Sequence, residues 1–73
     1  MNEKEALLKE LGFRIKELRK DKGVSQEKLG EMSGLHRTYI GMIERGEKNI
    51  TIYNLLLISK ALQTDIETIF NGF

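Results

Sequence analysis

The sequence predicts an all-α protein in which five helices pack as one compact domain. Apolar residues recur at three- and four-residue steps along the 73 residues, which is the period of an amphipathic helix. No stretch alternates apolar and polar residues as a half-buried strand does. No linker, internal repeat or low-complexity segment divides the chain. We therefore expect residues 1–73 to form a single unit.

The first predicted helix fills the N-terminal third of the chain and stops near Gly23. Charged residues lie outside its apolar stripe, which consists of Leu7, Leu8, Leu11, Ile15 and Leu18. Gly12 interrupts the stripe and leaves open a later start of this helix.

Two short helices are expected next, separated by a three-residue turn. Ser25 is a natural N-cap for a helix from Gln26 to about Ser33, and Gly34 is its stop. After Leu35 and His36, the following helix runs from about Arg37 to Arg45 and ends at Gly46. Two short helices with this spacing are typical of a helix-turn-helix.

The apolar residues of these two helices predict how they cross. We expect the inward side chains to be Leu29, Met32, Ile40 and Ile43. Gly30 supports a close crossing, because glycine inside a helix costs about 1 kcal/mol relative to alanine unless its small size is needed.

Two further helices complete the predicted fold. Thr51 can cap a fourth helix that continues through Leu62. Thr64 and Glu67 have the spacing of a capping box, which predicts a last short helix that begins at Thr64.

The composition argues against an enzyme, a metal protein and a membrane protein. The chain has no cysteine and one histidine, His36, and it contains neither a nucleophile–base constellation nor a glycine-rich phosphate loop. We therefore expect no catalytic residue, no metal site and no cofactor or small-molecule ligand. The charged N-terminus and the lack of a long apolar run predict a cytoplasmic protein.

Net charge alone gives little guidance about partners. Twelve basic and eleven acidic side chains leave a formal charge of +1, too balanced to indicate nucleic-acid binding. A short chain without disulfides has a modest core, however, which favours self-association as a source of extra stability.

Residues spread over about Gly12 to Phe70 resemble one known family. The matching positions are Ile15, Leu18-Arg19, Gly23-Val24-Ser25-Gln26-Glu27, Leu29, Gly34-Leu35, Tyr39-Ile40, Ile43-Glu44-Arg45-Gly46 and Ala61-Leu62. Together they resemble the lambda-repressor-like (Xre-type) helix-turn-helix proteins. The runs His36 to Ile40 and Glu44 to Thr51 are most similar to controller proteins of restriction–modification systems. The resemblance implies a five-helix DNA-binding domain with its helix-turn-helix at the second and third helices.

The start of the third helix is where this motif reads bases in the major groove. Arg37 is the first candidate, since arginine can donate two hydrogen bonds to guanine, and the resemblance also implies base contacts from Thr38 and Tyr39. Arg37 can equally be a solvated surface charge. Gly41, one turn later on the same exposed face, either lets the backbone approach DNA or is neutral.

Five residues are candidates for gripping phosphates. Ser25 and Gln26 stand at a helix N-terminus, where backbone N–H groups and a side-chain amide face an anion, although Ser25 can also be a plain cap. The resemblance implies backbone contacts from the loop residues Lys48, Asn49 and Thr51. The alternative for Lys48 is simple solvation.

Two other interpretations concern structure rather than DNA. The resemblance implies a largely buried ion pair between Arg19 and Glu44. His36 is read as a turn residue or N-cap rather than a metal ligand or base.

The C-terminal residues suggest a dimer interface. Helical i, i+3, i+4, i+7 spacing relates Ile66, Ile69, Phe70 and Phe73, which form either a self-complementary patch or part of the monomer core. We hypothesise a homodimer whose two recognition helices lie about 34 Å apart.

These observations predict a sequence-specific double-stranded DNA-binding transcriptional regulator that binds inverted repeats, in the manner of a restriction–modification controller. The alternative is an antitoxin-type module that binds a protein partner and autoregulates its operon, because that class often shares the fold. RNA binding is disfavoured, since Tyr39 alone makes no stacking platform.

Overall fold

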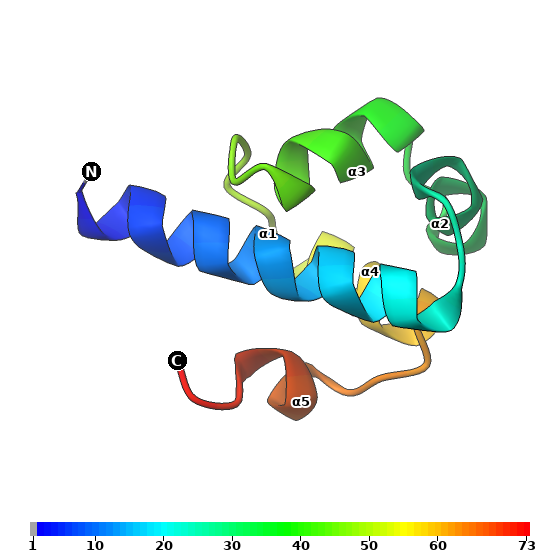
Figure 1. Ribbon diagram of the computed structural model, residues 1–73. Coiled ribbons are helices and arrows are strands. Elements are labelled where there is room, and N and C mark those ends of the chain that lie inside the picture. Colours follow the sequence, from blue (N-terminus) through cyan, green and yellow to red (C-terminus); the bar gives the residue numbers. More distant parts are fainter. Residues whose placement is uncertain (1) are drawn as a thin grey trace.

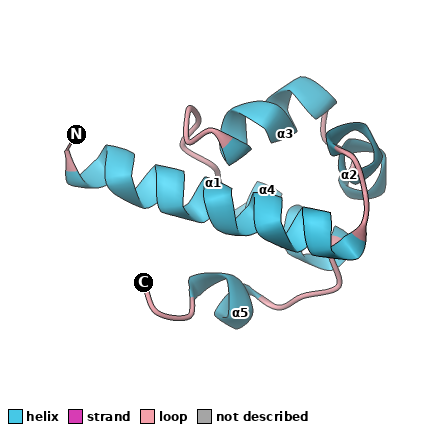
Figure 2. Ribbon diagram, in the orientation of Figure 1, coloured by secondary structure: helices cyan, strands magenta, loops and turns pink. Residues whose placement is uncertain are grey.

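The computed structural model describes residues 2–73, and in that range it contains five helices and no strand (Figures 1 and 2). Met1, which the predicted domain includes, lies outside the described residues. The helices are α1 (Glu3–Lys22), α2 (Gln26–Ser33), α3 (Arg37–Glu44), α4 (Ile52–Ala61) and α5 (Ile66–Phe70). Between residues 2 and 73, no helix has both the length and the apolar character needed to cross a bilayer. The all-α, five-helix prediction is confirmed.

Side chains cap the beginnings of the helices at the positions expected from the sequence. Ser25 Oγ accepts a hydrogen bond from the Lys28 N–H at 2.9 Å, and Thr51 Oγ1 accepts one from the Asn54 N–H at 3.1 Å. Each bond satisfies one of the amide groups that the first turn of a helix leaves unpaired. The predicted starts of α2 and α4 are therefore correct.

The start of α5 differs from the prediction. Asp65, and not Thr64, is its N-cap, because the Asp65 carboxylate accepts hydrogen bonds from both the N–H (2.8 Å) and the hydroxyl (2.7 Å) of Thr68. These bonds hold the pKa of Asp65 below its usual value. A carboxylate that takes two bonds caps better than the threonine hydroxyl one residue earlier, so the helix begins at Ile66.

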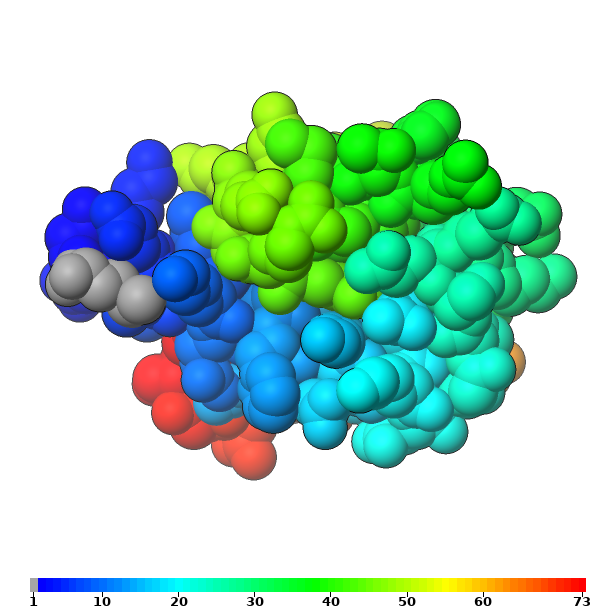
Figure 3. Space-filling model, turned by 45° about the horizontal axis from the view of Figure 1, so that its top comes forward, coloured from blue at the N-terminus to red at the C-terminus, as the bar shows by residue number. Residues whose placement is uncertain are grey.

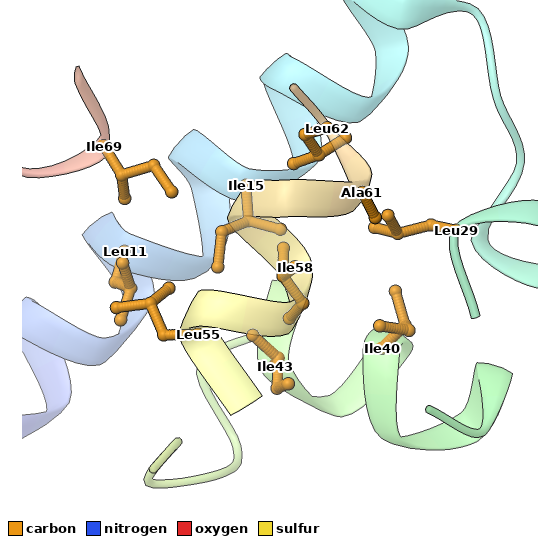
Figure 4. Packing of buried hydrophobic residues seen from close by; sticks show 10 residues of the cluster. All are labelled: Leu11, Ile15, Leu29, Ile40, Ile43, Leu55, Ile58, Ala61, Leu62 and Ile69. Atoms are coloured by element: carbon orange, nitrogen blue, oxygen red, sulfur yellow. The ribbon is translucent and has the colours of Figure 1, made fainter. Parts of the chain in front are cut away.

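The core is formed where α1 runs across the other helices, with α3 on one side of it and α5 on the other (Figure 1). Side chains from all five helices meet in a single apolar cluster (Figure 4). Its fully buried members are Ile15, Leu29, Ile40, Leu55, Ile58 and Ile69. Burial of this cluster fixes the position of α3 relative to the rest of the domain.

Two expectations for the apolar stripes are wrong. Met32 was expected to point inward, but it is 38% exposed, whereas Leu29, one turn earlier, is fully buried. Leu7 is 47% exposed, since the first turns of α1 project past the core. Both residues add apolar area to the surface.

Gly12 does not delay the start of α1, which is already helical from Glu3. It is buried in the middle of the helix, where a Cβ atom would lie 2.2 Å from the Ile43 carbonyl oxygen. Glycine is therefore required by the close crossing of α1 and α3.

The C-terminal turn is fastened to α1 by one arginine. Arg14 Nη1 donates to the carbonyl oxygens of Ile69, at 2.9 Å, and of Asn71. Its guanidinium also lies 4.3 Å from the centre of the Phe73 ring, within the range of a cation–π interaction. The last residues of the chain are thus held beside α1.

Candidate nucleic-acid interface

The crossing of α2 and α3 is rigid because backbone meets backbone there. A Cβ atom on Gly30 would lie 2.6 Å from the Leu35 carbonyl oxygen, and the Gly30 oxygen itself accepts hydrogen bonds from the N–H groups of Gly34 (2.8 Å) and Leu35 (3.0 Å). Leu29 and Ile40 are fully buried beneath the crossing. The prediction of a close approach at Gly30 is correct, although its partner is the turn before α3 and the first residue of that helix.

The first turn of α3 is presented on the surface, as Figure 3 shows for the green segment. His36 caps the helix through a 3.0 Å hydrogen bond from the Thr38 N–H to the imidazole Nδ1. Arg37 and Thr38 are both exposed. The helix that we expected to enter a DNA groove therefore begins with solvent-exposed residues.

Arg37 is held by a neighbour on α2. Its Nη1 atom donates to Glu27 Oε2 at 2.5 Å, and the two side chains are 64% and 62% exposed. The contact joins the first turn of α2 to the first residue of α3. The sequence analysis named Glu27 only as a position that resembles the family. Its contact with Arg37 was not predicted, because a ten-residue separation gives no periodic signal for it.

Tyr39 is less available than Arg37 and Thr38. Its ring is half-buried against the core, and its hydroxyl oxygen accepts a hydrogen bond from Asn54 Nδ2 at 3.0 Å. Because a phenol can accept and donate at once, the hydroxyl hydrogen is still free to reach an acceptor such as a phosphate.

Ser25 and Gln26 lie at the N-terminus of α2. Ser25 is exposed, and its hydroxyl can donate a hydrogen bond while its oxygen caps the helix. Gln26 is half-buried, and its Nε2 atom already donates to Glu44 Oε1 at 3.0 Å. One hydrogen-bonding group of the Gln26 amide is thus already used within the protein.

Arg19 and Glu44 form the ion pair that the resemblance implied. Arg19 Nε lies 2.7 Å from Glu44 Oε2 and Arg19 Nη2 lies 3.1 Å from Glu44 Oε1, and Arg19 Nη1 donates to the Val24 carbonyl at 2.9 Å. The side chains are only 11% and 2% exposed. Together with Gln26, the pair ties α1, the start of α2 and the end of α3 into one unit.

Gly41 lies on the same face of α3 as the exposed Arg37, but side chains cover it. It is buried, and a Cβ atom there would lie 3.1 Å from Arg45 Nη1 and 3.4 Å from Gln26 Oε1. The Arg45 side chain therefore lies back over α3 on the stripe that Arg37 begins two turns earlier. Arg37, Gly41 and Arg45 are spaced four residues apart. This spacing is the sequence signal that could have identified Arg45 as a residue on the same face as Arg37.

Arg45 also stays charged. Glu47 accepts hydrogen bonds from Arg45 Nε at 2.8 Å and from Nη2 at 3.3 Å. These hydrogen bonds raise the pKa of Arg45 and lower the pKa of Glu47 from their ordinary values. The Arg45 guanidinium at the C-terminal end of α3 is thus paired with the Glu47 carboxylate.

Lys48, Asn49 and Thr51 lie in the exposed loop between α3 and α4. Thr51 caps α4 through its oxygen, which leaves its hydroxyl hydrogen free. Asn49 lines a shallow hollow with Glu3, Lys4, Leu7 and Leu8, next to the start of α1. The structure keeps all three accessible to a ligand on this side of the domain.

The arrangement is suited to binding an anionic polymer. Exposed guanidinium, ammonium and hydroxyl groups surround a rigid helix, which can place donors against phosphates and base edges. Among residues 2–73, no three His, Cys, Asp or Glu side chains are grouped as a metal site.

Known proteins share the helix-turn-helix of this chain. A family model described as "Helix-turn-helix" matches residues 15–69. The control protein C.SmaI of Serratia marcescens is 46% identical over 56 residues, covering 77% of this chain and 67% of that protein. The control protein C.BamHI of Bacillus amyloliquefaciens is 48% identical over 52 residues, covering 70% and 64%. The chain therefore spans about two thirds of the length of these relatives.

Solved structures agree in fold and sequence. The restriction–modification controller protein C.AhdI of Aeromonas hydrophila superposes with a TM-score of 0.88 at 43% identity, covering 89% of this chain and 98% of that one. The controller C.Esp1396I, crystallised as a tetramer in complex with its natural 35 base-pair operator, superposes with a TM-score of 0.82 at 45% identity, covering 88% and 84%. Variants of that controller replace consecutive arginine, threonine and tyrosine residues.

Proposed function

Because the chain belongs to the helix-turn-helix family whose model spans residues 15–69, we propose that it is a transcriptional regulator that binds double-stranded operator DNA, as a controller of a restriction–modification system does. In this proposal the protein binds DNA without performing a catalytic step, and it acts in the cytoplasm, where the DNA lies. The named relatives are controllers and transcriptional regulators, so nothing in them supports the antitoxin alternative.

The observation that carries the proposal is the exposed start of α3 on a rigid crossing. The run Arg37-Thr38-Tyr39 is the only place in this sequence with arginine, threonine and tyrosine in succession, the same order that was mutated in the operator-binding relative. In this proposal Arg37 and Thr38 contact base edges, as the sequence predicts. Tyr39, which was predicted to contact a base, instead contacts a phosphate through its free hydroxyl hydrogen, because its ring is half-buried. Ser25, Gln26, Lys48, Asn49 and Thr51 supply the remaining phosphate contacts.

Two variants separate base reading from phosphate binding. Selection from a random duplex pool should return inverted repeats for the wild-type protein. Arg37→Ala should relax the preference at one base pair of each half-site, because the bidentate contact worth about 1–3 kcal/mol is gone. Lys48→Ala should weaken binding to all duplexes alike and reduce the salt-dependence slope by about one. Affinities from fluorescence anisotropy at several salt concentrations measure both effects.

Equal affinity of the wild-type protein for every duplex would exclude sequence-specific regulation. A loss of discrimination in Lys48→Ala that matches the loss in Arg37→Ala would contradict the assigned division of roles.

We also assign the homodimer of this proposal to a surface between α1 and α5. Leu7, Leu8, Leu11, Phe70 and Phe73 line an apolar groove there. Phe70 and Phe73 are 37% and 47% exposed, and their rings pack edge to face with centroids 5.4 Å apart. Ile69, expected in the interface, is wrongly assigned because it is fully buried in the monomer core, and Ile66 is half-buried against the same core.

Phe73→Ala should weaken dimerisation by roughly tenfold or more, because an aromatic anchor of a small interface is lost. Sedimentation equilibrium across the micromolar range measures the dimer dissociation constant. Phe13→Ala is the matched control, since Phe13 is 56% exposed and lies outside the groove. Equal weakening by both variants, or a wild-type protein that stays monomeric at high micromolar concentration, would contradict this interface.

A further inference from the structure

Glu27 is an acidic residue next to the residues that are proposed to bind DNA. It lies in the first turn of α2, directly after the phosphate candidates Ser25 and Gln26, and its carboxylate reaches across to Arg37 at 2.5 Å. Both side chains are exposed, and an exposed ion pair contributes little to folding. The contact therefore has no evident structural purpose.

The geometry of the pair leaves Arg37 able to bind a base. A guanidinium has five N–H donors, and Glu27 engages only the Nη1 atom. The Nε and Nη2 groups remain free, and together they form an edge that can donate two parallel hydrogen bonds to guanine. Because a flexible arginine loses rotamer freedom when it binds, a partner that orients the side chain beforehand favours the correct base.

The backbone positions of Glu27 and Arg37 cannot shift relative to one another. Gly30 packs so closely on Leu35 and on the backbone of Arg37 that the crossing of α2 and α3 is fixed. The Glu27 side chain consequently starts from a backbone position that is fixed relative to Arg37, beside a hollow lined by Gly30, Leu35 and His36.

The negative charge of Glu27 also has an unfavourable effect on DNA binding. A carboxylate close to the phosphates bound at the start of α2 repels every duplex, whatever its sequence. It lowers affinity without regard to bases, whereas its hold on Arg37 favours one base pair.

We propose that Glu27 is a positioning and specificity-determining residue of the DNA interface, which orients Arg37 toward its base and weakens binding to duplexes that lack that base. This inference rests on the proposed DNA-binding function and names a residue which that function alone does not assign.

Glu27→Gln removes the charge and keeps the shape. It should strengthen binding to a random-sequence duplex by about two- to fivefold at low salt, because one repulsive charge near the phosphates is gone. It should also reduce discrimination at the base pair that Arg37 reads by about threefold or more, within the range of one bidentate contact. Glu27→Asp keeps the charge but shortens the reach, so it should lose discrimination while random-duplex affinity stays unchanged.

Glu31→Gln is the matched control, since Glu31 is an exposed carboxylate on the same helix that pairs with Lys28 at 3.6 Å instead of with Arg37. It should leave discrimination at that base pair unchanged. In an Arg37→Ala background, Glu27→Gln should likewise have no effect on discrimination, as expected for a residue that acts through Arg37.

Competition binding with duplexes that differ only at that base pair measures all of these variants. Unchanged discrimination in both Glu27 variants would overturn the positioning role, and an equal loss in Glu31→Gln would do the same. If the wild-type protein itself fails to discriminate, the proposed regulatory function fails. If the wild-type protein discriminates and the Glu27 variants match it, only the inference about Glu27 fails.

Discussion

Replacing Glu44 with alanine is expected to lower the free energy of unfolding by about 3–5 kcal/mol, because the buried Arg19 guanidinium would lose its partner. Two hydrogen bonds, of 2.7 and 3.1 Å, join the two side chains, and Gln26 would lose its acceptor as well. A small domain has about 5–15 kcal/mol of stability or less, so this loss is a large fraction of the total. Urea denaturation followed by circular dichroism measures it.

Glu47→Ala is the matched control for Glu44→Ala. Glu47 also pairs with an arginine, but both of these side chains are about half exposed to solvent, so removal of Glu47 should leave the free energy of unfolding nearly unchanged. Replacing the buried pair together, as Arg19→Met with Glu44→Leu, should recover much of the loss, since no unpaired buried charge remains. A Glu44→Ala protein within 1 kcal/mol of the wild type would contradict the structural role of the pair.

The helices could be predicted from sequence because their signals are local. Ser25 and Thr51 cap the helices that they were expected to cap, and Gly23 and Gly34 end α1 and α2 in the left-handed conformation with φ of 77° and 78°. The error at α5 was also local, because Asp65 and Thr64 are both good caps and only the Asp65 carboxylate reaches two donors of Thr68.

The candidate site was harder to predict because its geometry depends on contacts between helices. Periodicity placed Gly41 on the exposed face of α3, but it could not show that Arg45 and Gln26 cover it. The same spacing argument grouped Ile69 with Phe70, although Ile69 points into the core that α1 and α4 share. The contact between Glu27 and Arg37 depends on the crossing angle of two helices, which no pattern in either helix contains.

Gly12→Ala is the second prediction with a large effect, and its sign is the opposite of what helix propensity suggests. Alanine is favoured over glycine in a helix by about 1 kcal/mol, so residue type alone predicts a more stable protein. In the folded domain, however, the new methyl group would lie 2.2 Å from the Ile43 carbonyl oxygen and 2.6 Å from that of Glu44. These are backbone atoms at the end of α3, which can move only if the helices separate.

Separation of α1 from α3 would loosen the packing around Ile15 and lengthen the bonds between Arg19 and Glu44. Overpacking of this kind costs about 1–3 kcal/mol and sometimes more, so we expect a net loss of about 2 kcal/mol in the free energy of unfolding. The shift would also displace α3, which carries the proposed base contacts. The free energy of unfolding, measured by chemical denaturation, and the DNA-binding affinity should therefore both decrease in this variant.

Gly41→Ala provides the matched control for Gly12→Ala. It adds the same methyl group inside a helix, but its nearest neighbours are the flexible ends of Arg45, at 3.1 Å, and Gln26, at 3.4 Å. Gln26 lies at an ordinary contact distance and does not have to move, and the exposed end of Arg45 can shift slightly at little cost. The gain in helix propensity should therefore leave stability unchanged or slightly higher. If Gly12→Ala proves as stable as Gly41→Ala, the close backbone contact between α1 and α3 does not constrain the fold.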